Sequence, residues 1–149
     1  MVQVYLDACC LNRPFDDQTQ NRIRLEAEAV LLILSQVEAG RWQWVGSEAL
    51  DYEIEQTPNA ERRMRVRLMT KAVHRSIKVE AAEEARAQQL ATLGFHALDA
   101  LHLACAESGG ADVLLTTDDR LLRLAVRLSA QLHIRVENPL TWLQEIESA

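Results

Sequence analysis

Short apolar runs that alternate with longer amphipathic segments are the feature that most constrains how this chain can fold. The apolar runs cover residues 2–6, 42–45, 77–79, 113–115 and 134–136, and segments with helical periodicity lie between them. Strands that alternate with helices form βαβ units, in which the strands lie parallel and helices cover both faces of the sheet. The pattern therefore predicts an α/β domain with a central, mostly parallel sheet.

The helical segments have recognisable start and stop signals. Residues 21–39 carry apolar side chains at helical spacing. Ser47 is a suitable N-cap for the next helix, which Pro58 interrupts, and Asn138 with Pro139 begins the last helix. Further helices are predicted over residues 80–93, 97–107 and 118–129, and a loop is predicted around residue 14. Because there is no linker and no internal repeat, residues 1–149 are expected to form a single domain.

Composition and local motifs exclude several classes of protein. No apolar run approaches the ~18–20 residues that span a membrane, and we expect no secretory signal because residues 1–10 indicate the start of a strand. We therefore expect a cytoplasmic protein with no membrane partner. Cys9, Cys10 and Cys105 form neither a disulfide framework nor a CxxC metal motif, and they are expected to be structural thiols. A Gly-rich phosphate loop and a GxSxG nucleophile turn are absent from the sequence.

Two aspartates directly follow predicted strands. Asp7 ends the first apolar run, and Asp118 follows the run at residues 113–117. Because open α/β sheets bind ligands beyond the carboxyl ends of their strands, both side chains are candidates for a functional site. Each also has a simpler interpretation, since an aspartate at this position can cap the helix that follows it. Taken alone, neither residue distinguishes capping from catalysis.

A third aspartate lies in a segment that offers its charge no solvated face. Residues 95–107 are apolar nearly all round, which is typical of a buried helix, and Asp99 falls beside Phe95, His102 and Leu103 on the helical wheel. A buried carboxylate is destabilising unless a partner compensates its charge. A salt bridge to His102 is one possible compensation, and a metal ion is the alternative that implies a function.

The fourth acid has to be chosen from a group within one predicted helix. Glu48, Asp51 and Glu55 share one side of the helical wheel, which is the expected solvent face. Glu53 falls instead within the apolar arc, so it is the acid expected to point inward. Glu48 remains the competing choice, because Pro58 makes the helix short and its register can slip.

Asp7, Glu53, Asp99 and Asp118 can converge only in the folded chain. Clustered carboxylates are hard oxygen ligands of the kind that Mg²⁺ and Mn²⁺ prefer. Phosphodiester hydrolysis needs such a cluster, because the metal lowers the pKa of a bound water, orients it and offsets charge on the phosphate. The four acids therefore predict a divalent-metal-dependent nuclease. Asp7, Asp99 and Asp118 are the expected metal ligands, and Glu53 is a ligand or the group that orients the nucleophile.

The net charge of −6 is unfavourable for a nucleic-acid-binding protein, but the basic residues are concentrated in one stretch. Residues 61–78 are strongly basic and are predicted to be largely helical. The stretch is either a solvated helix face or a surface that contacts phosphates. On the second interpretation, the RNA-contacting residues are Arg62, Arg63, Arg65 and Arg67.

These segments together resemble the PIN-domain family, which includes the VapC-type toxins of bacterial toxin–antitoxin systems. The matching stretches are VYLD at residues 4–7, SEALDYE at residues 47–53, LDALHLACA at residues 98–106 and LLTTDD at residues 114–119. The resemblance implies a three-layer α/β/α sandwich, Mg²⁺- or Mn²⁺-dependent endoribonuclease activity, a homodimer and, for a toxin, a cognate antitoxin. It also implies the four acids in order, Asp7, Glu53, Asp99 and Asp118, with Thr116 and Asp119 in support.

The chain departs from the family pattern after the first acid. The family commonly has Ser, Thr or Asn one or two positions later, whereas this chain has Ala8 and Cys9. A hydroxyl contact at the metal is therefore not assured, and Asn12 is the candidate polar replacement. His102 is expected to be a hydrogen-bonded structural residue. The tryptophans Trp42, Trp44 and Trp142 are expected to be core or dimer contacts.

The main alternative function is a non-catalytic PIN-fold module that binds RNA or a protein. Four intact acids argue against it, because carboxylates without a metal repel one another and repel phosphate. A phosphoryl-accepting receiver domain would need an acidic pair at the first strand and a late lysine, and no lysine follows Lys78. A dehalogenase-like phosphatase would need an aspartate at position 9, which is Cys9.

Overall fold

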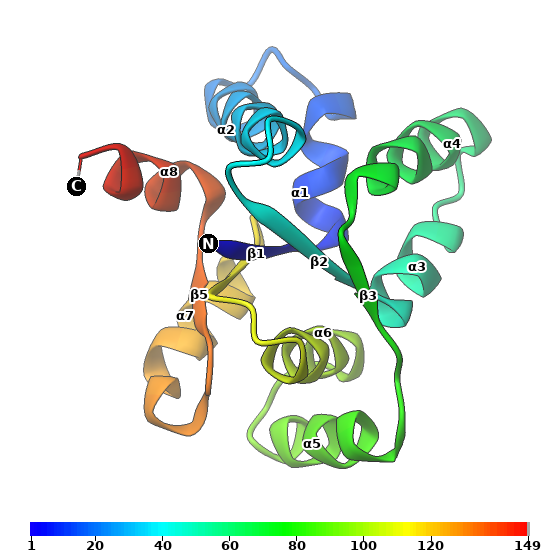
Figure 1. The fold of residues 1–149 in the computed structure, drawn as a ribbon, viewed down its shortest axis with the longest axis vertical. Coiled ribbons are helices and arrows are strands. Elements are labelled where there is room, and N and C mark those ends of the chain that lie inside the picture. The colour runs from blue at the N-terminus through cyan, green and yellow to red at the C-terminus, as the bar shows by residue number, and fades with distance from the viewer. Residues whose placement is uncertain (149) are drawn as a thin grey trace.

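Five short strands form a single sheet in the computed structural model, which describes residues 1–148 of the chain (Figure 1). They are β1 (Gln3–Leu6), β2 (Gln43–Ser47), β3 (Arg75–Ile77), β4 (Val113–Leu115) and β5 (Arg135–Glu137). The strand order is β3-β2-β1-β4-β5, and every neighbouring pair is parallel. The predicted α/β class with a parallel sheet is confirmed.

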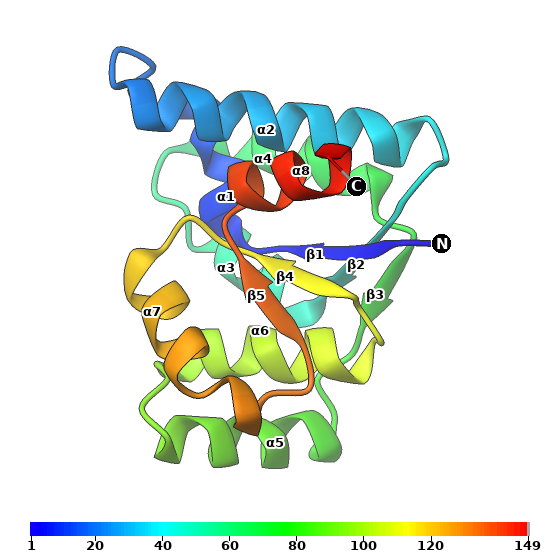
Figure 2. The ribbon, with the colours of Figure 1, turned by 90° about the vertical axis from the view of Figure 1, so that its left-hand side faces the viewer.

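Helices cover both faces of the sheet, so the predicted three-layer α/β/α arrangement is confirmed (Figures 1 and 2). One layer holds α1 (Ala8–Asn12), α2 (Asn21–Glu38), α4 (Ala60–Met69) and α8 (Pro139–Ser148). The other layer holds α5 (Ala81–Thr92), α6 (Ala97–Ser108) and α7 (Asp119–Arg127). Helix α3 (Glu48–Glu55) contacts both α4 and α6. Short 3-10 turns cover Arg13–Phe15, Thr70–Ala72 and Ser129–Gln131.

The chain changes direction across the sheet at β1. Strands β2 and β3 follow on one side of β1, whereas β4 and β5 lie on its other side (Figure 2). The segments after β1 and β4 therefore leave toward different helical layers, α1 toward one and α7 toward the other. A switch point of this kind leaves a crevice at the carboxyl ends of the two strands, which is where open α/β sheets bind ligands.

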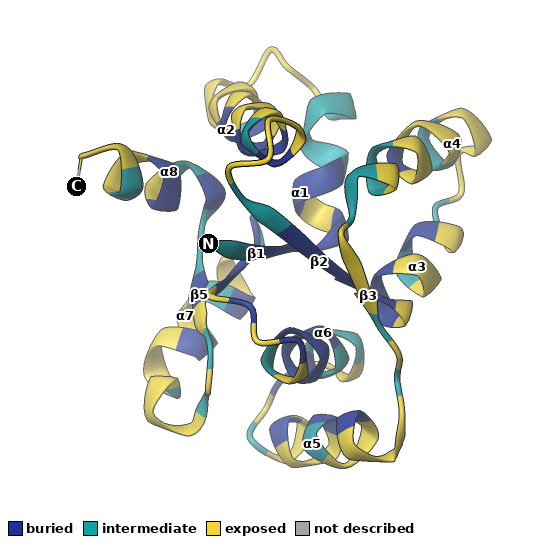
Figure 3. Cartoon of the chain, in the orientation of Figure 1, coloured by how far each residue is buried: buried dark blue, intermediate teal, exposed yellow. Residues whose placement is uncertain are grey.

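The strands divide their side chains between two apolar cores, one beneath each helical layer. Val4 and Leu6 of β1 belong to the core shared with α2, while Tyr5 between them belongs to the core shared with α6. The central strands are consequently buried on both faces (Figure 3). Strands of this kind give continuous apolar runs in the sequence, which is why the runs at residues 2–6 and 113–115 predicted them.

Two local differences from the sequence prediction have physical reasons. Strand β3 spans Arg75–Ile77 rather than residues 77–79, because it is an edge strand whose first two residues are exposed and no apolar run marks it. The loop predicted around Pro14 is preceded by the short helix α1, whose first turn the Asp7 side chain caps.

The tryptophans pack inside the protein. Trp44 is completely buried, and Trp42 stacks edge to face on Trp142 with ring centroids 5.1 Å apart. Of the predicted core or dimer contacts, the core role is confirmed for Trp44 and Trp142, and the partly buried Trp42 packs against the same core. Among residues 1–148, no helix combines the length and the apolar character that crossing a membrane requires.

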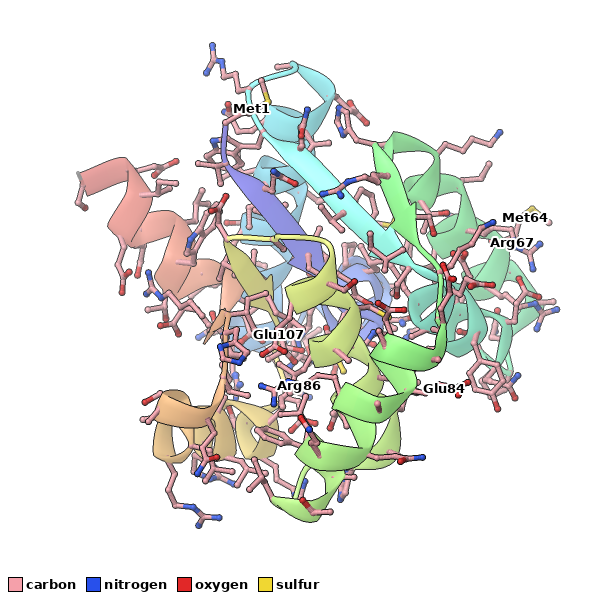
Figure 4. The ribbon with its side chains drawn as sticks, turned by 60° about the horizontal axis from the view of Figure 1, so that its bottom comes forward. Met1, Met64, Arg67, Glu84, Arg86 and Glu107 are labelled. Atoms are coloured by element: carbon pink, nitrogen blue, oxygen red, sulfur yellow. The ribbon has the colours of Figure 1, made fainter. Side chains whose placement is uncertain are left out.

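An ion pair between the outer and inner helices of one layer positions α6. Arg86 of α5 donates from Nε to Oε1 of Glu107 at 2.7 Å, and the Glu107 side chain is only 8% exposed (Figure 4). Oε2 of Glu107 also accepts from the backbone N–H of His133 at 2.8 Å. Because α6 bears Asp99 and His102, these contacts hold the helix that delivers two predicted site residues.

Candidate metal centre at the carboxyl edge of the sheet

Asp7 and Asp118 lie at the switch point, at the ends of neighbouring strands. The backbone N–H of Asp7 donates to the carbonyl of Leu115 at 3.2 Å. Both side chains cap helices, since Oδ1 of Asp7 accepts from the N–H of Cys10 at 3.1 Å and Oδ1 of Asp118 accepts from that of Arg120 at 2.9 Å. The capping interpretation is therefore correct for each. It uses one oxygen of each carboxylate and leaves the other for a further partner.

Thr116 connects the two aspartates. Its hydroxyl accepts from the backbone N–H of Asp118 at 3.1 Å and lies near enough to the Asp7 carboxylate to lower its pKa. Thr116 is fully buried, so these contacts are shielded from water. The structure thus places Thr116 between the first and the last predicted site acid.

Ionisation of Asp7 is unfavourable in the folded protein. The residue is 3% exposed, and burial raises its pKa from the ordinary 3.8 to about 6, with the charge of Glu53 adding to the rise. Thr116, the nearby His102 and the hydrogen bond from the Cys10 N–H lower the pKa without offsetting the burial. A cation at this position would therefore stabilise the ionised carboxylate.

Glu53 reaches the same region from α3. It lines a pocket together with Asp118, and its Oε1 lies 3.1 Å from Nε2 of His102. Glu48 is exposed instead, accepts from the backbone N–H of Val79 at 2.8 Å and lines a different hollow. Of the two competing acids, Glu53 is the one that faces the pocket.

Asp99 lies in the first turn of α6 and is partly buried. Burial raises its pKa, and the charges of Asp118 and Glu53 raise it further. The salt bridge to His102 that the sequence left open is absent from the described residues, because the His102 ring instead bonds Glu53. Asp99 therefore has no direct ion-pair partner there, and the nearby charges of His102 and His96 lower its pKa without offsetting the rise.

Cys9 is close enough to all four acids for their charges to act on its thiol, although only Glu53 and Asp118 of the four line the pocket. Its thiol pKa is raised well above the ordinary value by the charge of Asp7 and by burial, and then by Glu53, Asp118 and Asp99. Cys10 and Cys105 are buried, as expected of structural thiols, but Cys9 is exposed and lines the pocket. The prediction of a structural role for Cys9 is wrong, because the residue is exposed at the pocket instead of being buried. The sequence could not show this, since the direction of the side chain depends on how α1 follows β1.

The pocket has a volume of about 630 Å³ and is open to solvent. Beside Glu53, Asp118 and Cys9 its lining includes residues that sequence reasoning missed, namely Arg13, Gln56, Thr57 and Leu98. A signal was available for two of them, because Gln56 and Thr57 follow directly after the helix that bears Glu53, which ends at Glu55. Arg13 follows a short helix that the sequence did not predict.

No arginine or lysine compensates the charge of the four acids, a property they share in the described chain with other acids such as Glu48 and Asp51. The ion pair that Glu53 makes is with His102. No three His, Cys, Asp or Glu side chains in the described chain stand close enough together to form a closed ligand set. The available donors at the pocket are nevertheless hard carboxylate oxygens, which fit Mg²⁺ or Mn²⁺.

The remaining supporting residues have other partners. Both oxygens of Asp119 accept from the Arg22 guanidinium at 2.7 Å, which lowers the pKa of Asp119, and the residue does not line the pocket. Asn12 lines the pocket and donates from Nδ2 to the Ala8 carbonyl at 2.8 Å, while its buried Oδ1 has no hydrogen-bond partner in the described chain.

Each of the four predicted RNA-contacting arginines binds a protein acceptor. Arg62 donates to Asp16 at 2.8 Å, Arg63 to the Thr57 carbonyl at 2.7 Å and Arg65 to Glu61 at 2.8 Å, and Arg67 pairs with Glu55. Arg62 and Arg65 line hollows that continue the pocket, whereas Arg67 lies at the periphery on α4 (Figure 4). The fold therefore distinguishes arginines that looked equivalent in the sequence.

The fold and the site define an α/β protein with acids at the switch point of a parallel sheet, where Glu53 and Asp118 line a pocket without an arginine or lysine partner in residues 1–148. The sequence pattern of the PIN domain matches residues 4–127. The chain therefore belongs to the PIN domain family. No curated protein matches the chain closely enough to count as a relative.

Solved structures share this fold at low sequence identity. FitAcB from Neisseria gonorrhoeae is similar with a TM-score of 0.60 and 17% identity, over 91% of this chain and 97% of that one. VapBC2 from Rickettsia felis, bound to a DNA fragment from their promoter, has a TM-score of 0.60 and 13% identity, over 93% and 98% of the two chains. PAE2754 from Pyrobaculum aerophilum has a TM-score of 0.57 and 15% identity, over 99% and 91%. These likenesses establish the fold alone.

Proposed function

We propose that this PIN domain is an endoribonuclease that hydrolyses RNA phosphodiester bonds with Mg²⁺ or Mn²⁺. One observation supports the proposal above all. Carboxylates from four separate places in the chain, Asp7, Glu53, Asp99 and Asp118, raise the pKa of the same Cys9 thiol, and across residues 1–148 none has an arginine or lysine partner. Such a concentration of negative charge is destabilising unless a cation occupies it.

The proposed roles follow from how each side chain is fixed. Asp7, Asp99 and Asp118 would hold the cation directly or through water, and Glu53 would bind it or orient the attacking water. When bound, the cation would supply Lewis-acid polarisation of the phosphate and a lower pKa for water. Capping and the contacts of Thr116 fix the positions of Asp7 and Asp118 in advance, so little ordering is needed when the site fills.

A groove leading away from the acids supports RNA as the substrate. The pocket shares Asn12 and Thr57 with a second hollow, and that hollow shares Asn59 and Arg62 with a third. Arg65 also lines the third hollow. A polynucleotide strand lying in this groove would have its phosphates near arginines at one end and the acids at the other. We therefore propose Arg62 and Arg65 as the RNA contacts, with Arg63 and Arg67 as more distant contributors.

The experiment compares metal binding and RNA cleavage in matched variants. Asp99→Asn and Glu53→Gln should weaken Mn²⁺ binding measured by calorimetry and reduce cleavage of a labelled RNA by about tenfold or more. Glu48→Gln changes an acid on the same helix that faces elsewhere, and it should behave as wild type. Loss of function in Glu48→Gln rather than Glu53→Gln would reassign the second acid. Metal-independent RNA binding without cleavage would instead establish the non-catalytic binding module.

We also propose a homodimer and a cognate antitoxin as partners, on the family resemblance. Helix α2 leaves Leu25, Leu31 and Leu32 between 42% and 51% exposed, which offers apolar surface to another chain. Light scattering after gel filtration measures the oligomeric state. A small neighbouring reading frame with a DNA-binding N-terminus, whose product co-purifies with this chain and blocks cleavage, would establish the toxin assignment.

A further inference from the structure

A chain of buried polar side chains ends on Glu53. The Tyr5 hydroxyl lies 2.6 Å from Oγ of Ser47 and 2.6 Å from Nδ1 of His102, and Nε2 of His102 lies 3.1 Å from Oε1 of Glu53. Tyr5, Ser47 and His102 are at most 1% exposed, whereas the Glu53 side chain is 28% exposed at the pocket. The chain of hydrogen bonds therefore runs from the core beneath α6 to the proposed site.

The donors and acceptors of this chain can be assigned in one direction. A carboxylate only accepts, so Nε2 of His102 donates to Glu53, and Nδ1 is then available to accept from the Tyr5 hydroxyl. The Tyr5 oxygen accepts in turn from Ser47, whose Oγ accepts from the backbone N–H of Leu50 at 3.0 Å. With this assignment the polar side-chain atoms of Tyr5, Ser47 and His102 all have a partner of the right kind.

Packing alone does not require these polar groups. An apolar side chain in place of each would fill the core without the free energy that burying a hydroxyl and an imidazole costs. The partners come from β1, β2, α6 and α3, so the hydrogen bonds tie four elements to one carboxylate. Oε1 of Glu53 is held by His102, while no hydrogen bond to Oε2 is present in residues 1–148. One oxygen is thus fixed and the other is left for a ligand.

We propose that Tyr5 and His102 form a buried relay that orients the Glu53 carboxylate toward the acidic pocket. Both are positioning residues, since neither reaches the reacting atoms, and the inference rests on the proposed nuclease function. Side chains that hold a metal ligand in place from outside the coordination sphere typically change metal affinity or activity by about 10–100-fold when they are replaced.

Two amide substitutions at position 102 separate positioning from packing. In His102→Gln the amide nitrogen lies near the place of Nε2, so donation to Glu53 is retained while the bond to Tyr5 is lost. In His102→Asn the amide ends near the place of Nδ1, so the bond to Tyr5 is retained and Glu53 is out of reach. Both variants disturb the same buried position. Tyr5→Phe removes only the hydroxyl, and it is the replacement test of the relay if either amide variant does not fold.

The measurements are calorimetric Mn²⁺ binding and steady-state cleavage of a short labelled RNA by the full chain, with folding checked by circular dichroism. We expect His102→Asn to weaken Mn²⁺ binding by about tenfold or more and to lower kcat with little change in KM. His102→Gln should stay within about threefold of wild type, and Tyr5→Phe should fall between the two. In a Glu53→Gln background, His102→Asn should have no further effect on Mn²⁺ binding.

The outcomes distinguish failure of the relay from failure of the proposed function. Equal losses in His102→Gln and His102→Asn, or additive losses in the double variant with Glu53→Gln, would overturn the relay and leave the nuclease proposal intact. A wild-type protein that neither binds Mn²⁺ nor cleaves RNA would overturn the proposed function, and the relay with it. If neither amide variant folds, wild-type Mn²⁺ affinity in Tyr5→Phe would overturn the relay.

Discussion

Replacing Asp7 by asparagine should stabilise the metal-free protein even though it removes a proposed metal ligand. Asparagine preserves the local geometry, because its Oδ1 can still accept from the N–H of Cys10 and its Nδ2 can lie near the Thr116 hydroxyl. What the substitution removes is a carboxylate that is 3% exposed and has no arginine or lysine partner in residues 1–148. The expected gain in the free energy of unfolding equals the extra cost of ionising that carboxyl in the folded protein compared with the unfolded chain.

The magnitude follows from the pKa of Asp7, which burial raises from 3.8 to about 6. At ~1.4 kcal/mol per pKa unit, ionisation destabilises the folded state by about 3 kcal/mol. A carboxyl whose pKa is higher in the folded state contributes stability below its unfolded pKa, and that contribution is lost as the pH rises through its folded pKa. The asparagine variant has no such loss. The gain should therefore be small near pH 4 and reach about 3 kcal/mol above pH 7.

The assay is urea unfolding of wild type and Asp7→Asn in the presence of a chelator, at about pH 4 and about pH 8. For a domain of this size, about 3 kcal/mol corresponds to a rise in Tm of roughly 6–12 °C. Asp119→Asn is the control, because Arg22 lowers the pKa of Asp119. That substitution should reduce stability at the higher pH, which is the opposite sign.

Two results would refute this reasoning. One is a gain for Asp7→Asn that is the same at both pH values, which would mean that ionisation of Asp7 is not its source. The other is a loss of stability at about pH 8, which would mean that the carboxylate is well compensated in the folded protein. Adding Mn²⁺ should stabilise wild type more than the variant, since only a state that binds the ion gains from it.

Three further predictions concern packing, reactivity and a buried ion pair. Gly109→Ala places a methyl group 2.9 Å from Cγ1 of both Ile77 and Val45 and should cost about 1–3 kcal/mol of stability in urea unfolding, so an unchanged midpoint would contradict it. Cys9 should react slowly with iodoacetamide, and Asp7→Asn should speed the reaction about tenfold for each pKa unit recovered, as followed by mass spectrometry. Glu26→Gln disturbs a 2% exposed carboxylate bound by Arg13, Arg22 and Asn138 and should cost about 2–4 kcal/mol, whereas exposed Glu28→Gln on the same helix should be neutral in thermal melts.

The sequence by itself determined the architecture and the candidate acids. Strands buried on both faces appear as apolar runs, and helices appear as periodic segments with caps, so the parallel α/β class followed from local patterns. Asp99 stood out because its helix is apolar nearly all round, and Glu53 because it falls on the inward side of its own helix. These are properties of a residue and its near neighbours, which the sequence displays directly. The edge strand β3 and helix α1 were misplaced or missed because neither has such a pattern.

Only the tertiary structure decided what each acid touches and which basic residues lie beside the pocket. Tyr5 and His102 are 97 residues apart, and His102 and Glu53 are 49 apart, so no local pattern could join them. The effect of all four acids on the pKa of the Cys9 thiol likewise depends on the direction in which α1 follows β1. Electrostatic compensation acts through space between distant segments. For that reason the sequence could supply the charged residues of the site but not their partners. Only the folded structure shows how they pair, and that the four acids have no arginine or lysine partner in residues 1–148.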